Sequence, residues 1–106
     1  MKKGSIILIP FPFTDLKGSK IRPAIVLCQS ELDVTICFIT SELRWKTECD
    51  VSIFPCKDNG LKVPSLIRVG KIATINSDLV LGELGELSNS EIRELNNGLK
   101  QLLQIS

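Results

Sequence analysis

Short apolar runs rich in β-branched residues recur at close spacing through the first three quarters of this 106-residue chain. Runs of this length favour strands, because β-branched side chains fit a pleated surface and a helix needs about ten or more residues. We therefore expect strands over residues 6–9, 24–28, 34–39, 51–54, 65–69 and 72–75. Residues 30–33 and 58–60 are expected to turn, and Gly70-Lys71 to mark a bulge. Pro55 ends the fourth run, which is typical of a strand at a sheet edge.

The C-terminal part of the chain has a different pattern. Ser88 followed by Glu91 forms a capping box, which predicts that a helix begins there. Apolar residues then recur at helical spacing, namely Ile92, Leu95, Leu99, Leu102 and Leu103. Gly98 weakens this helix by about 1 kcal/mol relative to alanine. Many short strands followed by one amphipathic helix predict a mainly β fold with a C-terminal helix, a small curved β-barrel forming a single domain over residues 1–106.

Charge is nearly balanced over the whole chain, at a formal net charge of +1, which argues against a general binder of polyanions. It is not evenly distributed, however. Residues 1–22 carry five basic side chains against Asp15 alone, and these are Lys2, Lys3, Lys17, Lys20 and Arg22. The apolar run at the N-terminus is too short for a signal peptide or a membrane span, so we expect a cytoplasmic protein.

Cysteine and histidine content limits the possible chemistry. The cysteines, at positions 28, 37, 49 and 56, include no Cys-x-x-Cys pair, and the chain has no histidine. We expect free thiols, no metal site and no cofactor. Catalysis by Ser-His-Asp or Cys-His groups is excluded. Protons in any reaction would have to move through carboxylates, lysine, arginine or water.

Arg22 stands at the entrance of the second expected strand. Pro23 fixes the backbone immediately after it, and an apolar run follows. A guanidinium presented in this way suits a phosphate, because its donors match two phosphate oxygens at once. The alternative interpretation is a solvated arginine at a strand end.

Several segments, read in order, resemble the MazF/PemK family of toxin endoribonucleases over nearly the whole chain. They are Lys3-Gly4-Ser5-Ile6-Ile7, Phe11-Pro12-Phe13-Thr14-Asp15 followed by Gly18-Ser19-Lys20, Arg22-Pro23-Ala24-Ile25-Val26-Leu27, Phe38-Ile39-Thr40-Ser41, and the segment from Ser65 to Ile75. The resemblance implies an SH3-like barrel of the CcdB/PemK type that works as a homodimer. It also implies metal-free cleavage of single-stranded RNA to 2′,3′-cyclic phosphate and 5′-hydroxyl ends. A cognate MazE/PemI-like antitoxin would silence this activity.

The resemblance also implies roles for individual residues. Arg22, Thr40 and Arg68 are expected to be catalytic, and the expected RNA-binding residues are Lys17, Lys20, Ser41, Trp45 and Lys71. Each has a plainer alternative. Thr40 and Ser41 would terminate a strand through local hydrogen bonds. Arg68 would be an exposed pairing residue, the lysines would be solvated, and Trp45 would contact a partner or cap the barrel.

The chain departs from the PemK-like pattern at its acid–base positions. Gly70 stands where that branch has a carboxylate two residues after the arginine, Asn76 replaces a later acid, and the loop histidine is absent. The general base is therefore open between Asp15, Glu42, and proton transfer through water with Arg22 and Lys20.

Two other functions are considered. One is a CcdB-like toxin that binds gyrase, although the C-terminus lacks the Trp-Gly-Ile ending of those toxins. The other is a catalytically degenerate RNA-binding homologue.

Overall fold

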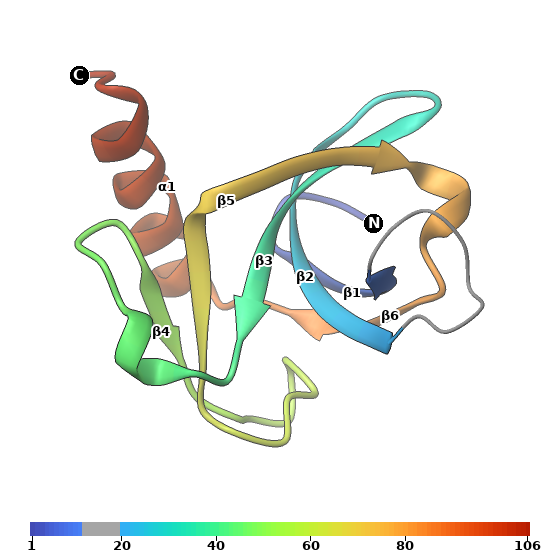
Figure 1. Ribbon diagram of the computed structural model, residues 1–106, viewed down its shortest axis with the longest axis horizontal. Coiled ribbons are helices and arrows are strands. Elements are labelled where there is room, and N and C mark those ends of the chain that lie inside the picture. Colours follow the sequence, from blue (N-terminus) through green and yellow to red (C-terminus); the bar gives the residue numbers. More distant parts are fainter. Residues whose placement is uncertain (12–19) are drawn as a thin grey trace.

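The computed structural model describes residues 1–11 and 20–106. Six antiparallel strands of this part form one sheet in the order β4-β5-β3-β2-β1-β6. Figure 1 shows the sheet curling into a half-barrel with helix α1 against one end. The strands are β1 (Ser5–Phe11), β2 (Lys20–Gln29), β3 (Asp33–Thr40), β4 (Val51–Ile53), β5 (Ser65–Asn76) and β6 (Gly82–Glu86). The helices are η1 (Leu43–Trp45), η2 (Ser77–Leu79) and α1 (Asn89–Leu103). The expected mainly β fold with a C-terminal helix is confirmed.

Pro10 and Pro23 lie in parts of β1 and β2 that pair with a neighbouring strand on one side only. Pro10 is in β1 beyond Leu8, the last β1 residue that pairs with β6. Pro23 is in β2 beyond Ala24, where pairing with β3 ends. A proline has no N–H to donate, so it is tolerated in a strand at a position that faces no partner on one side. Both strands therefore continue through prolines, and they are longer than the sequence predicts.

Strand β5 joins two segments that the sequence predicts as separate strands. Its pairing with β3 shifts between Phe38, opposite Arg68, and Cys37, opposite Ile72. Residues 69–71 are therefore extra on the β5 side, which confirms the bulge expected at Gly70-Lys71. Bulges of this kind bend and twist a strand, and β5 turns a sharp corner in Figure 1.

Two apolar clusters fill the fold on either side of this corner. One contains Leu95 of α1 together with Ile53 and Ile67, and α1 packs on β4 and β5. The other contains Ile9, Val34 and Ile36, among other residues. The bend lets one sheet enclose both clusters.

Helix α1 begins as expected. The Ser88 hydroxyl accepts a hydrogen bond from the Glu91 N–H, and the Glu91 carboxylate accepts one from the Ser88 N–H, which completes the capping box. The apolar stripe is buried at Leu95, whereas Leu102 and Leu103 are exposed. Gly98 is buried, and a Cβ there would lie 2.4 Å from the Cys49 carbonyl oxygen. Glycine at this position therefore permits close packing against the segment before β4.

In the described part of the chain, no helix is long and apolar enough to cross a membrane.

Candidate functional site

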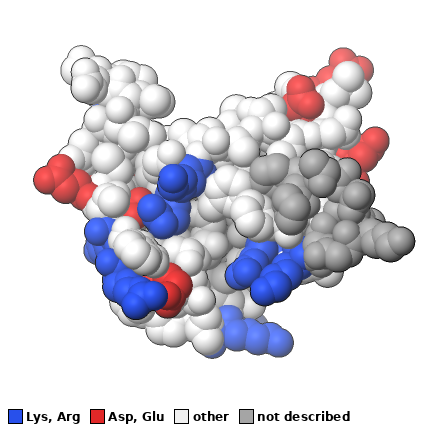
Figure 2. All heavy atoms as spheres, in the orientation of Figure 1, with Lys and Arg blue, Asp and Glu red and all other residues white. Residues whose placement is uncertain are grey.

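Basic side chains gather in separate groups on one face of the molecule. In Figure 2, Lys and Arg atoms form several separate groups across the middle and lower part of this face, and most Asp and Glu atoms lie toward its edges, although one acidic group lies among the lower cations. The net charge of +1 hides this local excess. Charge gathered in this way raises the local concentration of an anionic ligand.

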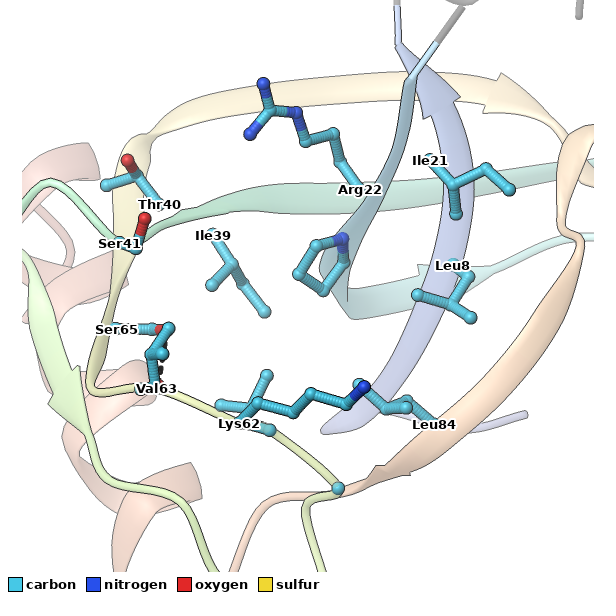
Figure 3. Close-up of a pocket in the computed structure, with 13 residues that line it drawn as sticks. Leu8, Ile21, Arg22, Ile39, Thr40, Ser41, Lys62, Val63, Ser65 and Leu84 are labelled. Atoms are coloured by element: carbon cyan, nitrogen blue, oxygen red, sulfur yellow. Dashed lines mark hydrogen bonds between the residues drawn. The ribbon is translucent and has the colours of Figure 1, made fainter.

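Arg22 and Thr40 meet where β2 and β3 separate. Backbone pairing between these strands ends at Ala24 and Phe38, and Arg22 and Thr40 lie two residues beyond that pair. The arginine is exposed and the threonine is half-buried. Figure 3 shows the Arg22 side chain extending toward the end of β3, where Thr40 and Ser41 lie side by side. The strand register thus brings together two residues that are 18 positions apart in the sequence.

The larger of two neighbouring clefts, of about 450 Å³, opens beside this pair. Most of its lining is apolar, and Arg22, Thr40, Ser41, Lys62 and Ser65 supply polar groups. In Figure 3 the Lys62 side chain runs along the rim opposite Arg22. The remaining lining residues are Leu8, Ile21, Pro23, Ile39, Gly60, Leu61, Val63 and Leu84. Such a cleft offers an apolar surface with cations at two of its sides.

The smaller cleft, of about 380 Å³, shares Arg22, Ile39 and Thr40 with the larger one. Its other lining residues are Phe11, Phe38, Arg68 and Lys71. The two phenylalanine rings meet edge to face, with their centroids 5.6 Å apart. Phe38 pairs with Arg68 across β3 and β5, which explains why both reach the same cleft. The two clefts therefore meet at Arg22 and Thr40.

The charge of the two clefts has one sign. Arg22, Lys62, Arg68 and Lys71 line them, and none of their lining residues in the described part of the chain is Asp or Glu. Apolar surface interrupted by cations fits a ligand that alternates flat apolar groups with negative charges. A single nucleic-acid strand has this composition, with bases between phosphates.

Arg68 is held by a carboxylate that lies outside the clefts. Its Nε atom is 3.4 Å from Oδ2 of Asp50, whose side chain is 1% exposed, whereas that of Arg68 is 24% exposed. Asp50 also accepts hydrogen bonds from the backbone N–H groups of Thr47, at 3.0 Å, and Val69, at 3.1 Å. Arg68 is therefore neither a free surface cation nor an exposed pairing residue, since it connects a buried acid to the smaller cleft.

Cys37 lies close to the same carboxylate. Burial and then the charge of Asp50 raise the pKa of its thiol from an ordinary value of 9.0 to about 12. The Cys37 Sγ atom is 3.6 Å from the Val69 carbonyl oxygen, to which it can donate. The thiol stays protonated at neutral pH, so it is a packing group and not a nucleophile.

A family model matches nearly the whole chain. It describes PemK-like, MazF-like toxins of type II toxin–antitoxin systems and matches residues 2–103. The chain belongs to this family.

Solved structures agree with that assignment at the level of the fold. An endoribonuclease in complex with its cognate antitoxin from a Mycobacterial species superposes with a TM-score of 0.79 at 17% identity, covering 100% of this chain and 97% of that one. The Mycobacterium tuberculosis toxin MazF-mt6 gives 0.79 at 20% identity, covering 96% and 98%. A MazE-MazF complex from Deinococcus radiodurans gives 0.77 at 19%, covering 100% and 97%. A search of curated proteins by sequence finds no match.

Thr40 and Ser41 belong to the site of this family member in different ways. The Thr40 Oγ1 atom accepts a hydrogen bond of 3.1 Å from the Glu42 N–H, as the local-bonding interpretation expects. A hydroxyl that accepts one bond still has its proton to donate, and Thr40 lines both clefts. Ser41 is exposed and lines the larger cleft only.

The other predicted RNA-binding residues are not all in the clefts. Lys71 lines the smaller one. Lys20 is exposed at the start of β2, opposite Phe11, and lines neither. Trp45 is 56% exposed and lies outside both clefts, with the Arg44 guanidinium carbon 5.3 Å from its ring centroid. Its exposure contradicts the interpretation that it caps the barrel. Lys17 lies outside the described residues, as does Asp15.

The sequence did not reveal two residues that the structure brings to the site. Asp50 reaches Arg68 from the segment before β4, and Lys62 enters the larger cleft from the loop before β5. For Asp50, the only local signal is an acid just before an edge strand. For Lys62 there is none, because a lysine two residues after a turn glycine usually points to solvent.

Proposed function

We propose that this toxin cleaves single-stranded RNA in the two joined clefts, at the phosphate that lies against Arg22 and Thr40. The observation that supports this most strongly is the junction itself. An exposed cation and a hydroxyl lie there between two apolar-lined clefts, whose charged lining residues in the described chain are all basic.

The shape and chemistry of the clefts favour a single strand. Both sides of the junction have apolar surface, which is aromatic in the smaller cleft, so a base on each side has something to pack against. Bases in a duplex are stacked on each other and are not available for this packing. We therefore propose that RNA crosses the junction unpaired, with one base in each cleft.

The reaction proposed is attack by a ribose 2′-oxygen on the adjacent phosphorus. A bond forms between O2′ and phosphorus, and the bond from phosphorus to O5′ breaks. The 2′-hydroxyl proton leaves, and a proton must reach the departing 5′-oxygen. The products are a 2′,3′-cyclic phosphate and a 5′-hydroxyl. No metal or cofactor enters this scheme.

Arg22 carries the main electrostatic role in this scheme. Its exposed guanidinium would bind two oxygens of the phosphorane, where negative charge accumulates. Thr40 would donate its hydroxyl proton to the same group, and Arg68 would add charge from the smaller cleft. An arginine is too weak an acid for us to assign Arg68 the proton transfer.

The scheme also needs a general base for the 2′-hydroxyl proton. Glu42 is an unsuitable candidate, because it pairs with Arg44 at 3.0 Å and lines neither cleft. We propose that the proton passes to Asp15, or to water next to Arg22 and Lys20. The Asp15→Asn variant distinguishes the two: a loss of activity would assign the base to Asp15, and retained activity would leave water.

Partners of the toxin are also part of the proposal. Related structures contain a toxin with its cognate antitoxin, or MazE with MazF. We propose that a MazE/PemI-like antitoxin occupies the basic clefts, that the toxin is a homodimer, and that it acts in the cytoplasm. Acidic side chains on the antitoxin would complement the clefts, and antitoxin and RNA would then compete.

The decisive test compares Arg22→Ala with Arg93→Ala, a change on the exposed face of α1. Removing Arg22 should lower the rate of RNA cleavage by about 10²–10³-fold, the usual effect of losing one such donor. Removing Arg93 should leave the rate unchanged. Equal activity of both variants, with both folded, would contradict the proposal.

Two other functions give different results in simple experiments. A CcdB-like gyrase inhibitor acts through its C-terminus, so removal of residues 104–106, which follow α1, should abolish its toxicity. An RNA-cleaving toxin should keep most of its activity after that truncation. A degenerate homologue would bind RNA and release no product. The observation that favours this alternative is that no carboxylate is among the described cleft residues, so none of them is an evident general base.

A further inference from the structure

We propose that Asp50 is a positioning residue that acts through Arg68, fixing the guanidinium against the smaller cleft so that it meets bound RNA in one orientation. The inference rests on the proposed function for its substrate. The inference is based on a spatial arrangement at the corner of β5: the buried Asp50 carboxylate contacts the half-buried Arg68, and Arg68 lines the smaller cleft.

Asp50 cannot act on the substrate directly. Its side chain is 1% exposed, and it lines neither cleft. Oδ1 accepts the Val69 N–H, and Oδ2 accepts the Thr47 N–H and lies 3.4 Å from Nε of Arg68. A carboxylate that accepts these two backbone hydrogen bonds and faces Arg68 is held in place. Any effect of Asp50 on RNA must therefore pass through the groups that it holds.

Arg68 is the one among these groups that reaches a cleft. It lines the smaller cleft next to Phe38 and Lys71, while its Nε side faces Asp50. Pairing through Nε leaves the two terminal nitrogens of the guanidinium for a ligand in the cleft. A long flexible side chain would otherwise sample many rotamers, and fixing it in advance reduces the entropy lost on binding.

The backbone around Arg68 is held by the same carboxylate. Arg68 is the last β5 residue before the register shift, and Val69 is the first residue of the bulge. The Val69 N–H, which the bulge removes from the regular ladder, donates to Asp50 instead. Asp50 therefore fixes both the side chain of Arg68 and the bend from which it projects.

A double-mutant cycle tests this role. Cleavage of a short single-stranded RNA is measured for the wild type, Asp50→Asn, Arg68→Gln and the double variant. In parallel, binding is measured with the same RNA carrying 2′-deoxyribose at the cleavage position. Asparagine retains an acceptor for Val69 but removes the charge that faces Arg68. We expect Asp50→Asn to lower kcat by about 10–100-fold, the usual range for a misplaced group, and to change activity less than about 2-fold when Arg68 is already Gln.

Controls separate positioning from loss of stability. Val51→Ala, next to Asp50 in β4, loosens the same strand without touching Arg68, and its effect should be the same in both backgrounds. Arg68→Lys keeps a cation against Asp50 without the fork, and it replaces Arg68→Gln if that variant does not fold. Thermal unfolding of every variant shows whether it is folded at the assay temperature.

The outcomes distinguish this inference from the proposed function. Coupling between positions 50 and 68 in cleavage or in binding supports a positioning role. If the wild type binds RNA without cutting it, the cleavage proposal fails and the binding arm alone decides the role of Asp50. Equal losses from Asp50→Asn in both Arg68 backgrounds, or no coupling in either arm, would overturn the inference and make Asp50 a purely structural residue.

Discussion

The two arginines of the site are held in different ways. Arg22 is exposed and forms no ion pair within the described residues, whereas Arg68 shares a buried carboxylate at 3.4 Å. An unpaired cation keeps its full charge for a ligand. A paired one contributes to the fold as well as to the site, because its removal leaves a buried acid without a counter-charge.

This difference predicts separate effects on stability. Arg68→Ala should reduce the free energy of unfolding by about 1–3 kcal/mol, the cost of a buried polar group that loses its partner. Arg22→Ala should change it by less than about 0.5 kcal/mol, as is usual at an exposed position. Urea denaturation of both variants at pH 7 measures this contrast. Equal destabilisation by the two changes would show that the pair with Asp50 is not formed in solution.

Cys37 predicts a loss of stability at alkaline pH. Its thiol has a pKa of about 12 in the folded chain against 9.0 ordinarily, so the unfolded chain gives up this proton first. The stability that depends on the protonated thiol is complete below pH 9 and falls as the pH rises toward 12. Denaturation at pH 8 and at pH 10.5 should show a steeper decline for the wild type than for Cys37→Ala. Parallel declines would contradict the raised pKa.

At the scale of elements, Gly98 determines how closely α1 approaches the segment before β4. Alanine usually stabilises a helix by about 1 kcal/mol relative to glycine. Here its Cβ would lie 2.4 Å from the Cys49 carbonyl oxygen. We therefore expect Gly98→Ala to destabilise the protein by about 1–3 kcal/mol, as overpacking does.

A matched glycine provides the control for that prediction. A Cβ on Gly82, in β6, would meet nothing within 4 Å. Gly82→Ala should therefore be neutral or slightly stabilising, and thermal unfolding of the two variants gives the comparison. A gain in stability from Gly98→Ala would mean that helix propensity outweighs the close contact.

Most elements could be predicted from local sequence, and the exceptions have physical reasons. The capping box at Ser88 and the bulge at Gly70-Lys71 are local signals, and both are confirmed. The sequence does not predict strand β6, because Gly-Glu-Leu-Gly-Glu has little intrinsic preference for a strand. Pairing with β1 makes it one.

For the candidate site too, local sequence predicts some residues, and long-range contacts bring in others. Arg22 and Thr40 were identified from motifs at the ends of expected strands, and β2 and β3 bring them together. The sequence does not predict the pair of Asp50 with Arg68, because Asp50 lies just before β4, Arg68 lies in β5, and the two meet only through the β4–β5 pairing and the bend of β5. Contacts of this kind leave no periodic pattern in a sequence.

At the scale of the whole molecule, the charge of the clefts predicts how binding depends on salt. Four cations line the clefts in the described chain. Each phosphate contact with a single strand contributes about −0.7 to the slope of log Kobs against log salt, so we expect a slope near −3. Lys71→Ala should make the slope about 0.7 less steep. Fluorescence anisotropy with 2′-deoxy-substituted RNA measures both values, and a slope near zero would contradict phosphate binding in the clefts.

The central claim, metal-free RNA cleavage at the Arg22–Thr40 junction, is tested most directly by the chemistry of the product ends. A long single-stranded RNA is incubated with wild-type protein in EDTA, and both new ends are mapped. We predict cuts at one short sequence, with a 2′,3′-cyclic phosphate on one side and a 5′-hydroxyl on the other, and cleavage about 10²–10³-fold slower with Arg22→Ala. Intact RNA in the presence of folded, antitoxin-free wild type, or 3′-hydroxyl and 5′-phosphate ends, would contradict the account.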